Sequence, residues 1–303
     1  MPQDTLKLTT QGHELDTSPD AFGPLQASTD LLHDFDAIRS RLEEEGYVFL
    51  PGYLDRDEVM AARQAMCEKL DAFGFLDPNC PVLESMAGAD GPKQSYCPEL
   101  AHDNPPLMKL LYSGRMIDFY EKLFGVPVRH FDYTWCRSIS RGKGTPPHCD
   151  VVYMGRGSQR LLTSWTPMGD VSFEDGGLMI MEKSNHLARL GERYCRRDVD
   201  NFCTNRHDEN GEPMKQDPNF GMLTKNPVRL RRKLGLRWLT GEYRAGDLLV
   251  FTIRTIHTSL DNHGPRIRLS TDSRYQPADD RWISIEGRPP KLHGEAARRE
   301  LIC

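Results

Sequence analysis

The 303-residue chain changes character near residue 125, and this change limits the folds that it can adopt. Before that point apolar residues recur at helical spacing, as they do over 30–45 with Leu31, Phe35, Ile38 and Leu42. After it, short β-branched and aromatic runs are separated by Gly, Pro and Asp, with no helix between them long enough for a parallel sheet. Helices followed by strands predict a mainly β chain, with an antiparallel barrel or jelly roll behind a helical buttress.

The same patterns place the individual elements. Helices are expected over 30–45, 55–73 and 113–124, each followed by a glycine that ends it. The second of them begins at Asp55 as an N-cap, and its buried face is expected to contain Val59, Ala62, Met66, Leu70 and Phe73. Strands are expected over 47–53, 128–140, 161–168, 178–181, 248–253 and 266–275.

We interpret the chain as a single domain spanning 1–303. Its expected parts are a loose N-terminal arm (1–28), a mostly helical buttress (30–125), a jelly-roll core (126–280) and a C-terminal tail (281–303). A loop over 76–105, rich in Pro, Gly, Asp and Asn, is long enough to act as a lid.

A charged, irregular segment over 187–240 is interpreted as an insertion between two strands that covers the mouth of the barrel. Its basic side chains are candidates for holding an anionic substrate, although a solvated face is the favoured interpretation. They are Lys225, Arg229, Arg231, Arg232, Lys233 and Arg237.

Composition narrows the possible partners and the location. The net charge of -5 gives no general attraction to nucleic acid or to anionic membranes. No apolar run approaches the ~20 residues that span a bilayer, and the N-terminus lacks the pattern of a secretory signal. Eight scattered cysteines without a Cys-x-x-Cys pair predict free thiols in a reducing cytoplasm. We therefore expect a cytoplasmic protein that acts on small molecules, as a monomer or a homodimer.

The motif His148-Cys149-Asp150 carries the first sign of chemistry. On an extended strand the first and third residues share a face, so this pair could bind one metal ion while Cys149 points away as a packed thiol. His257, 109 residues later at the end of a strand, is the proposed third ligand; His263, in a turn beyond it, is a weaker candidate. Two histidines and one carboxylate leave other metal positions open, as in non-haem Fe(II) oxygenases.

A wider pattern joins these residues to a known family. His148-x-Asp150, His257-x-Ser259-x-x-Asn262 and Arg268-x-Ser270 together resemble the phytanoyl-CoA dioxygenase family of Fe(II)/2-oxoglutarate oxygenases. Trp165-Thr-Pro-Met and the stretch 177–186 also resemble the family, although this stretch lacks the usual Pro-Gly. The resemblance covers roughly 30–280. It implies a double-stranded β-helix, Fe(II) as cofactor, and 2-oxoglutarate and O2 as cosubstrates, with succinate and CO2 as products.

The resemblance also implies roles for single residues. Arg268 would bind the distal carboxylate of 2-oxoglutarate in a guanidinium–carboxylate fork, with a hydroxyl from Ser259 or Ser270, and Trp165 would line the same pocket. Each also has a structural alternative: Arg268 could pair with an acid of the barrel, and Trp165 could be plain core. Related halogenases have a small residue in place of the ligand carboxylate, so Asp150 favours hydroxylation, without excluding desaturation, epoxidation or ring formation.

Candidates for substrate contact are fewer and weaker. Trp135 and Arg137 share a face of the strand that leads to the metal motif, and Tyr153 and Arg156 follow the motif; ordinary packing is the alternative for all four. The resulting hypothesis is a hydroxylase that oxidises a C–H bond of a small metabolite, such as a natural-product intermediate. The alternatives are a zinc-type hydrolase with a metal-activated water and an inactive jelly-roll binding protein. Neither of them needs a carboxylate anchor at Arg268.

Overall fold

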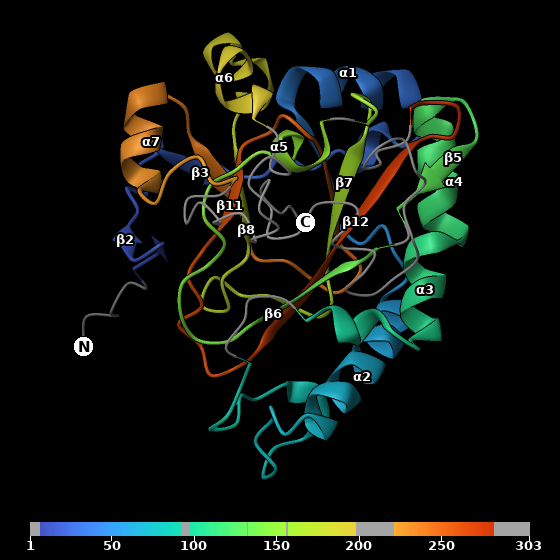
Figure 1. Ribbon diagram of the computed structural model, residues 1–303, viewed down its shortest axis with the longest axis vertical. Helices are drawn as coiled ribbons and strands as arrows, with labels where there is room; N and C mark the ends of the chain where they lie inside the picture. The colour runs from blue at the N-terminus through green and yellow to red at the C-terminus, as the bar shows by residue number, and fades with distance from the viewer. Residues whose placement is uncertain (1–6, 93–96, 132, 156, 198–220, 282–303) are drawn as a thin grey trace, which may run out of the picture.

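The computed structural model describes residues 7–92, 97–131, 133–155, 157–197 and 221–281, and its centre is a pair of β-sheets (Figure 1). The larger sheet has the order β4-β10-β7-β12-β5, with β6 also paired to β12, and the smaller has the order β11-β8-β9-β3. The larger sheet contains β4 (Tyr47–Leu50), β5 (Val128–His130), β6 (Trp135–Ile139), β7 (Leu162–Pro167), β10 (Leu248–Thr252) and β12 (Arg268–Pro277). The smaller contains β3 (Phe22–Pro24), β8 (Leu178–Met181), β9 (Trp238–Thr240) and β11 (His257–Ser259).

Two sheets packed on one apolar layer confirm the predicted jelly roll. All pairs in these sheets are antiparallel except that of β3 with β9. Side chains of both sheets meet in one buried cluster, which includes Trp165 and Phe251 from the larger sheet and Ile180 and Leu239 from the smaller. Burial of this layer, at about 25 cal/mol per Å² of apolar surface, holds the sheets together.

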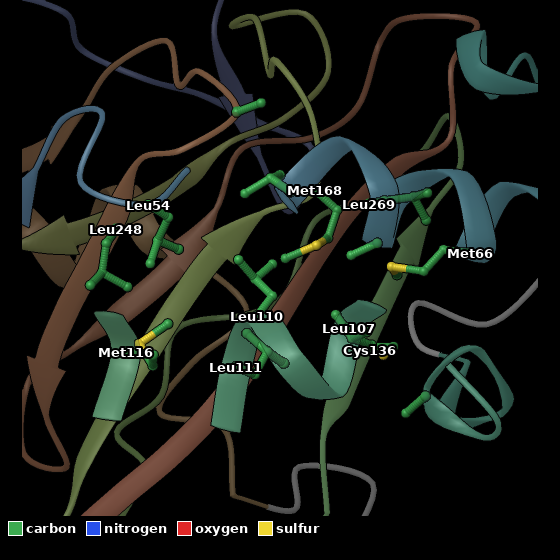
Figure 2. Close-up of a cluster of buried hydrophobic side chains, with 14 of the residues drawn as sticks. Leu54, Met66, Leu107, Leu110, Leu111, Met116, Cys136, Met168, Leu248 and Leu269 are labelled. Atoms are coloured by element: carbon green, nitrogen blue, oxygen red, sulfur yellow. The ribbon is translucent and has the colours of Figure 1, made fainter. Parts of the chain in front are cut away.

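The helical buttress is also present, and it covers the outer face of the larger sheet. Figure 2 shows leucines of α3 and Met116 of α4 packed with Leu248 and Leu269 of the sheet. In the described part of the chain, no helix is long and apolar enough to cross a membrane. The helices of the buttress are α1 (Phe35–Glu45), α2 (Arg56–Ala72), α3 (Pro105–Tyr112) and α4 (Gly114–Phe124).

Three details of the buttress differ from the prediction. The first helix begins at Phe35, because the Asp34 side chain caps it. α3 was not predicted, although Asn104 caps it and two prolines follow, a typical helix start. Phe73 is 44% exposed, because it lies just past the end of α2, where it packs against Phe75.

The N-terminal arm was wrongly predicted to be loose, since residues 7–28 are ordered against the core. β1 (Thr9–Thr10) pairs with β2 (His13–Glu14), and β3 joins the smaller sheet. The buried carboxylate of Asp261 accepts hydrogen bonds from the backbone N–H groups of Gln11 and Gly12, each at 2.8 Å. These partners lie about 250 residues away along the chain, so no local pattern could indicate the contact.

The described residues of the predicted insertion over 187–240 include regular elements. β9 lies within this range, and its three residues are buried in the smaller sheet between β8 and β3. Residues 198–220 lie outside the described part. The remaining short elements are η1 (Thr29–Leu31), η2 (Val82–Glu84), η3 (Pro98–Ala101), α5 (Val151–Met154), η4 (Ser184–His186), α6 (Ala188–Glu192), η5 (Tyr194–Arg196) and α7 (Pro227–Leu234).

We predict that Asp261→Ala detaches the N-terminal segment. The substitution leaves the buried N–H of Gly144 without its acceptor, at about 1–3 kcal/mol, and removes the acceptor of the partly buried N–H groups of Gln11 and Gly12. Amide hydrogen exchange over residues 9–12 should accelerate, and the free energy of unfolding in urea should fall. Asp16→Ala is the control, because the Asp16 carboxylate is exposed and, among the described residues, binds only Ser18 of the same segment and, at 3.6 Å, Arg231. Unchanged exchange in Asp261→Ala would show that this carboxylate does not hold the segment.

Candidate metal centre

The backbones of His148 and His257 lie side by side. Each N–H donates to the carbonyl of the other at 3.0 Å, forming an isolated bridge that places His148 next to the first residue of β11. Asp150 does not lie on the same strand, as the sequence had suggested, because its backbone is helical (φ -65, ψ -21) and leads into α5. Cys149 is fully buried among apolar side chains, which confirms its interpretation as a packed thiol.

Despite this turn, the three predicted ligands converge. Oδ1 of Asp150 lies 3.7 Å from Nε2 of His148 and 3.7 Å from Nε2 of His257. All three side chains are buried. In the part of the chain that the structure describes, no other group of three His, Cys, Asp or Glu side chains is close enough to share a metal ion.

Each histidine ring has one unprotonated nitrogen, Nε2, that can bind a metal ion. Nδ1 of His148 lies 2.8 Å from the Pro146 carbonyl oxygen, and Nδ1 of His257 lies 3.1 Å from that of Thr255. A carbonyl oxygen only accepts, so Nδ1 carries the proton and Nε2 is left free for a metal. Burial lowers the pKa of His148 to about 3 and also lowers the pKa of His257. Both rings are therefore neutral at neutral pH, as ligation requires.

The second oxygen of Asp150 is occupied by the protein. Oδ2 accepts a hydrogen bond from the Thr163 hydroxyl at 2.6 Å and one from the Arg274 guanidinium at 3.1 Å. Burial by itself raises the pKa of Asp150, but the charge of Arg274 and the hydrogen bond from Thr163 oppose it, and that pKa lies below the usual range. The carboxylate is therefore charged, with Oδ1 left to face the histidines.

Thr163 and Arg274 were not predicted as part of the site. Arg274 shares a strand face with Arg268, because alternate residues of β12 point the same way, and this spacing was the available signal. The Arg274 guanidinium also lies 4.0 Å from the centre of the Trp135 ring, as a cation–π contact. Thr163, an ordinary threonine on β7, offered no such signal.

Between these two arginines lies Asp272, which binds Arg137. Nε of Arg137 donates to Oδ2 of Asp272 at 2.8 Å, and its NH2 group lies 2.7 Å from the same oxygen. Of the predicted substrate residues, Trp135 and Arg137 are thus engaged with β12. Tyr153 meets the His148 ring edge-on at 5.8 Å between ring centres, and Arg156 lies outside the described residues.

Arg268 is a buried cation without a carboxylate partner among the described residues. It is 4% exposed, and it donates to the Ser270 hydroxyl at 2.5 Å. Its Nε has no hydrogen-bond partner, and a buried N–H in this state implies an acceptor from elsewhere. Burial lowers the pKa of Arg268 to about 10, so it remains charged at neutral pH. The guanidinium lies 5.9 Å from the Trp165 ring centre.

Two predicted candidates remain, Ser259 and His263. The Ser259 hydroxyl oxygen accepts a hydrogen bond from the backbone N–H of Thr145 at 2.8 Å. His263, the weaker candidate for third ligand, is exposed and contacts the Thr9 hydroxyl, so it takes no part in the cluster.

Comparison with known proteins agrees with this geometry. Residues 42–270 match the sequence profile of the family described as Phytanoyl-CoA dioxygenase (PhyH). The 1-deoxypentalenic acid 11-beta-hydroxylase of Streptomyces exfoliatus is 28% identical over 265 residues, which cover 82% of this chain and 84% of that protein.

Solved structures show the same fold. The epimerase SnoN of nogalamycin biosynthesis, in complex with Fe3+, alpha ketoglutarate and nogalamycin RO, is 22% identical with a TM-score of 0.56, covering 89% of this chain and 96% of that one. EctD from S. alaskensis, in its apoform, is 15% identical with a TM-score of 0.57, covering 97% and 96%.

We predict that Arg274→Met destabilises the metal-free protein by about 3 kcal/mol, because it leaves Asp150 buried without its cation. The free energy of unfolding in urea, measured with a chelator present, tests this. Lys109→Met is the control, since it breaks a largely exposed ion pair with Glu58 and should cost less than about 1 kcal/mol. Equal losses in the two variants would show that the buried pair carries no special stability.

Proposed function

The chain belongs to the phytanoyl-CoA dioxygenase family of Fe(II)- and 2-oxoglutarate-dependent oxygenases, and from that premise we propose that it hydroxylates a C–H bond of a small-molecule metabolite. We propose His148, Asp150 and His257 as the iron ligands. The convergence of two neutral Nε2 atoms and one carboxylate oxygen is the observation that carries the proposal. Bound iron would supply the redox chemistry that couples O2 and 2-oxoglutarate to oxidation of the substrate.

The chain's own residues keep metal positions open for this chemistry. Thr163 and Arg274 both bind Oδ2 of Asp150, so only Oδ1 is left as a ligand. The protein would then hold a metal ion through three ligand atoms, one each from His148, Asp150 and His257, and the remaining positions would be open to cosubstrates. A zinc-type hydrolase, the alternative from the sequence, has no need of the unpartnered Arg268 in the same barrel.

Arg268 is the proposed anchor for 2-oxoglutarate. A dicarboxylate brings the acceptor that its Nε lacks, and a charge-assisted bond in a buried site is stronger than a neutral one. Ser270 orients the guanidinium through their hydrogen bond. We assign the Ser259 hydroxyl as a second donor to the same carboxylate and Trp165 as a wall of the pocket.

The type of oxidation and the substrate class are also proposals. SnoN, which shares this fold, is an epimerase, so the fold alone does not decide the type of oxidation. The carboxylate of Asp150 favours hydroxylation over halogenation. The curated relative, named for an 11-beta-hydroxylase of 1-deoxypentalenic acid, supports a small-molecule substrate. We propose Trp135, Arg137, Tyr153 and Arg156 as the substrate-side residues. The single domain, the cytoplasmic location and a lack of nucleic-acid partners remain predictions of the sequence.

We predict that apo-protein given Fe(II) and then 2-oxoglutarate without oxygen develops a weak visible charge-transfer band, and that oxygen then yields succinate. His148→Ala and Asp150→Ala should lower iron affinity and turnover by more than ~100-fold, because loss of a direct ligand costs more affinity than loss of a residue that only orients a ligand. His263→Ala is the control and should keep both. The proposal fails if the unmodified protein shows neither band nor succinate, or if His263→Ala loses the band while His257→Ala keeps it.

We predict that Arg268→Ala weakens 2-oxoglutarate binding by about 10- to 100-fold, the equivalent of a lost charge-assisted hydrogen bond. Titration of the charge-transfer band with 2-oxoglutarate measures this, and Fe(II) affinity without 2-oxoglutarate should be unchanged. Arg266→Ala is the control, because Arg266 comes two residues before Arg268 in the chain and its guanidinium pairs with Asp175. An unchanged affinity in Arg268→Ala would move the anchor elsewhere.

A further inference from the structure

Two cysteines meet behind the loop that carries His148 and Asp150. Cys149 lies between these two proposed ligands, with its side chain in a buried apolar cluster, and Cys195 of η5 packs against the same cluster. The Cys149 thiol donates a hydrogen bond to the sulfur of Cys195. The two thiols are therefore in direct contact, although they lie far apart in the sequence.

A second contact joins the same two parts of the chain. The backbone N–H of Cys149 donates to the hydroxyl of Tyr194, the residue before Cys195, at 3.1 Å. The Cα atoms of η5 and of α5, which begins two residues after Cys149, approach within 8 Å. Backbones this close can be joined by a disulfide after a small shift, since bonded cysteines have Cα atoms about 4.4–6.8 Å apart.

The surroundings of Cys195 favour its thiolate, which is the reactive form of a cysteine. The hydrogen bond from Cys149 and the charge of Arg254 lower the pKa of Cys195, against burial, which raises it. Cys80 is also half-buried, but burial and the Asp77 carboxylate raise its pKa. Of these two half-buried thiols, Cys195 is therefore the one prepared to react with an oxidant.

We propose that Cys149 and Cys195 are a modification site, at which a hydroperoxide closes a reversible disulfide. With hydrogen peroxide, the Cys195 thiolate attacks one oxygen, the O–O bond breaks, and a sulfenic acid forms. The hydroxide that leaves takes up the proton that Cys195 had released, and becomes water. The Cys149 sulfur then attacks the Cys195 sulfur, the S–O bond breaks, and the hydroxyl leaves as a second water with the Cys149 proton. Two thiols thus give two electrons to one peroxide.

The disulfide joins η5 to the metal-ligand loop without using a metal position, because Cys149 is not among the side chains that converge on that position. Backbone hydrogen bonds to His257 and Leu223 already hold the loop. η5 is a single short turn, so it is the part that shifts to close the bond. Disulfides in a reducing cytoplasm are usually transient, which agrees with a bond that opens again when a reductant is present.

The test treats the full chain with hydrogen peroxide in a Cys203→Ser/Cys303→Ser background, because these two cysteines lie outside the described residues. A chelator keeps iron from generating other oxidants. We expect the chain to lose the mass of two hydrogen atoms, and tryptic peptides joined through Cys149 and Cys195 to appear. Dithiothreitol should restore both thiols, and amide hydrogen exchange in η5 should be slower in the oxidised protein than in the reduced protein.

Variants separate the steps. Cys149→Ser should prevent the cross-link and leave Cys195 as a sulfenic acid that dimedone traps, and Cys195→Ser should leave Cys149 reduced. Arg254→Gln should slow disulfide formation about 3- to 10-fold at neutral pH, because it removes the cation that favours the thiolate. Arg244→Gln is the control, since it removes an exposed arginine that pairs with Asp170, and it should keep the rate.

Three results would overturn the inference. The first is that Cys149 and Cys195 stay reduced while Cys80 is oxidised. The second is a disulfide between other cysteines, such as Cys97 and Cys136, in place of the expected one. The third is equal rates of oxidation in Arg254→Gln and the unmodified protein. These measurements use neither iron nor turnover, so their outcome does not depend on the proposed function.

Discussion

The buried ion pair between Asp150 and Arg274 is the interaction on which the rest of the site depends. A carboxylate this deeply buried would normally take up a proton, because desolvation penalises the charged form. Arg274 offsets that penalty, and Thr163 adds a second donor to the same oxygen. The pair thus fixes both the charge of Asp150 and the oxygen that it presents to the histidines.

The pair in turn depends on the register of β12. This strand is buried along its whole length, and its two faces differ in chemistry. Leu269 and Tyr275 join the helical buttress on one face, while Arg268, Asp272 and Arg274 point toward the barrel interior on the other. A shift of one residue would exchange the faces, so the apolar contacts of the buttress also align the arginines with their partners.

Residues whose spacing is local or repeated could be predicted from the sequence, and residues whose role depends on distant contacts could not. The pair His148 and Asp150 was found through its close spacing, yet the expected common strand was wrong because the backbone turns at Asp150. Thr163 carried no signal, because its role comes only from its contact with the Asp150 carboxylate. Arg274 carried only its spacing from Arg268, because its partner Asp150 lies far away along the chain. The ordered N-terminal segment escaped for the same reason.

The ligand loop shows why an irregular segment can still hold a precise geometry. Pro146 and Pro147 have no N–H groups, so this stretch cannot form a full strand ladder. Its carbonyls are nevertheless used: that of Pro146 holds the His148 ring, and that of Pro147 accepts from Leu223. The Thr145 carbonyl accepts from the Thr258 hydroxyl at 2.6 Å. Because this stretch is not part of a regular strand, the chain can turn at Asp150. The loop is held in place by Thr258 of β11 and by Leu223.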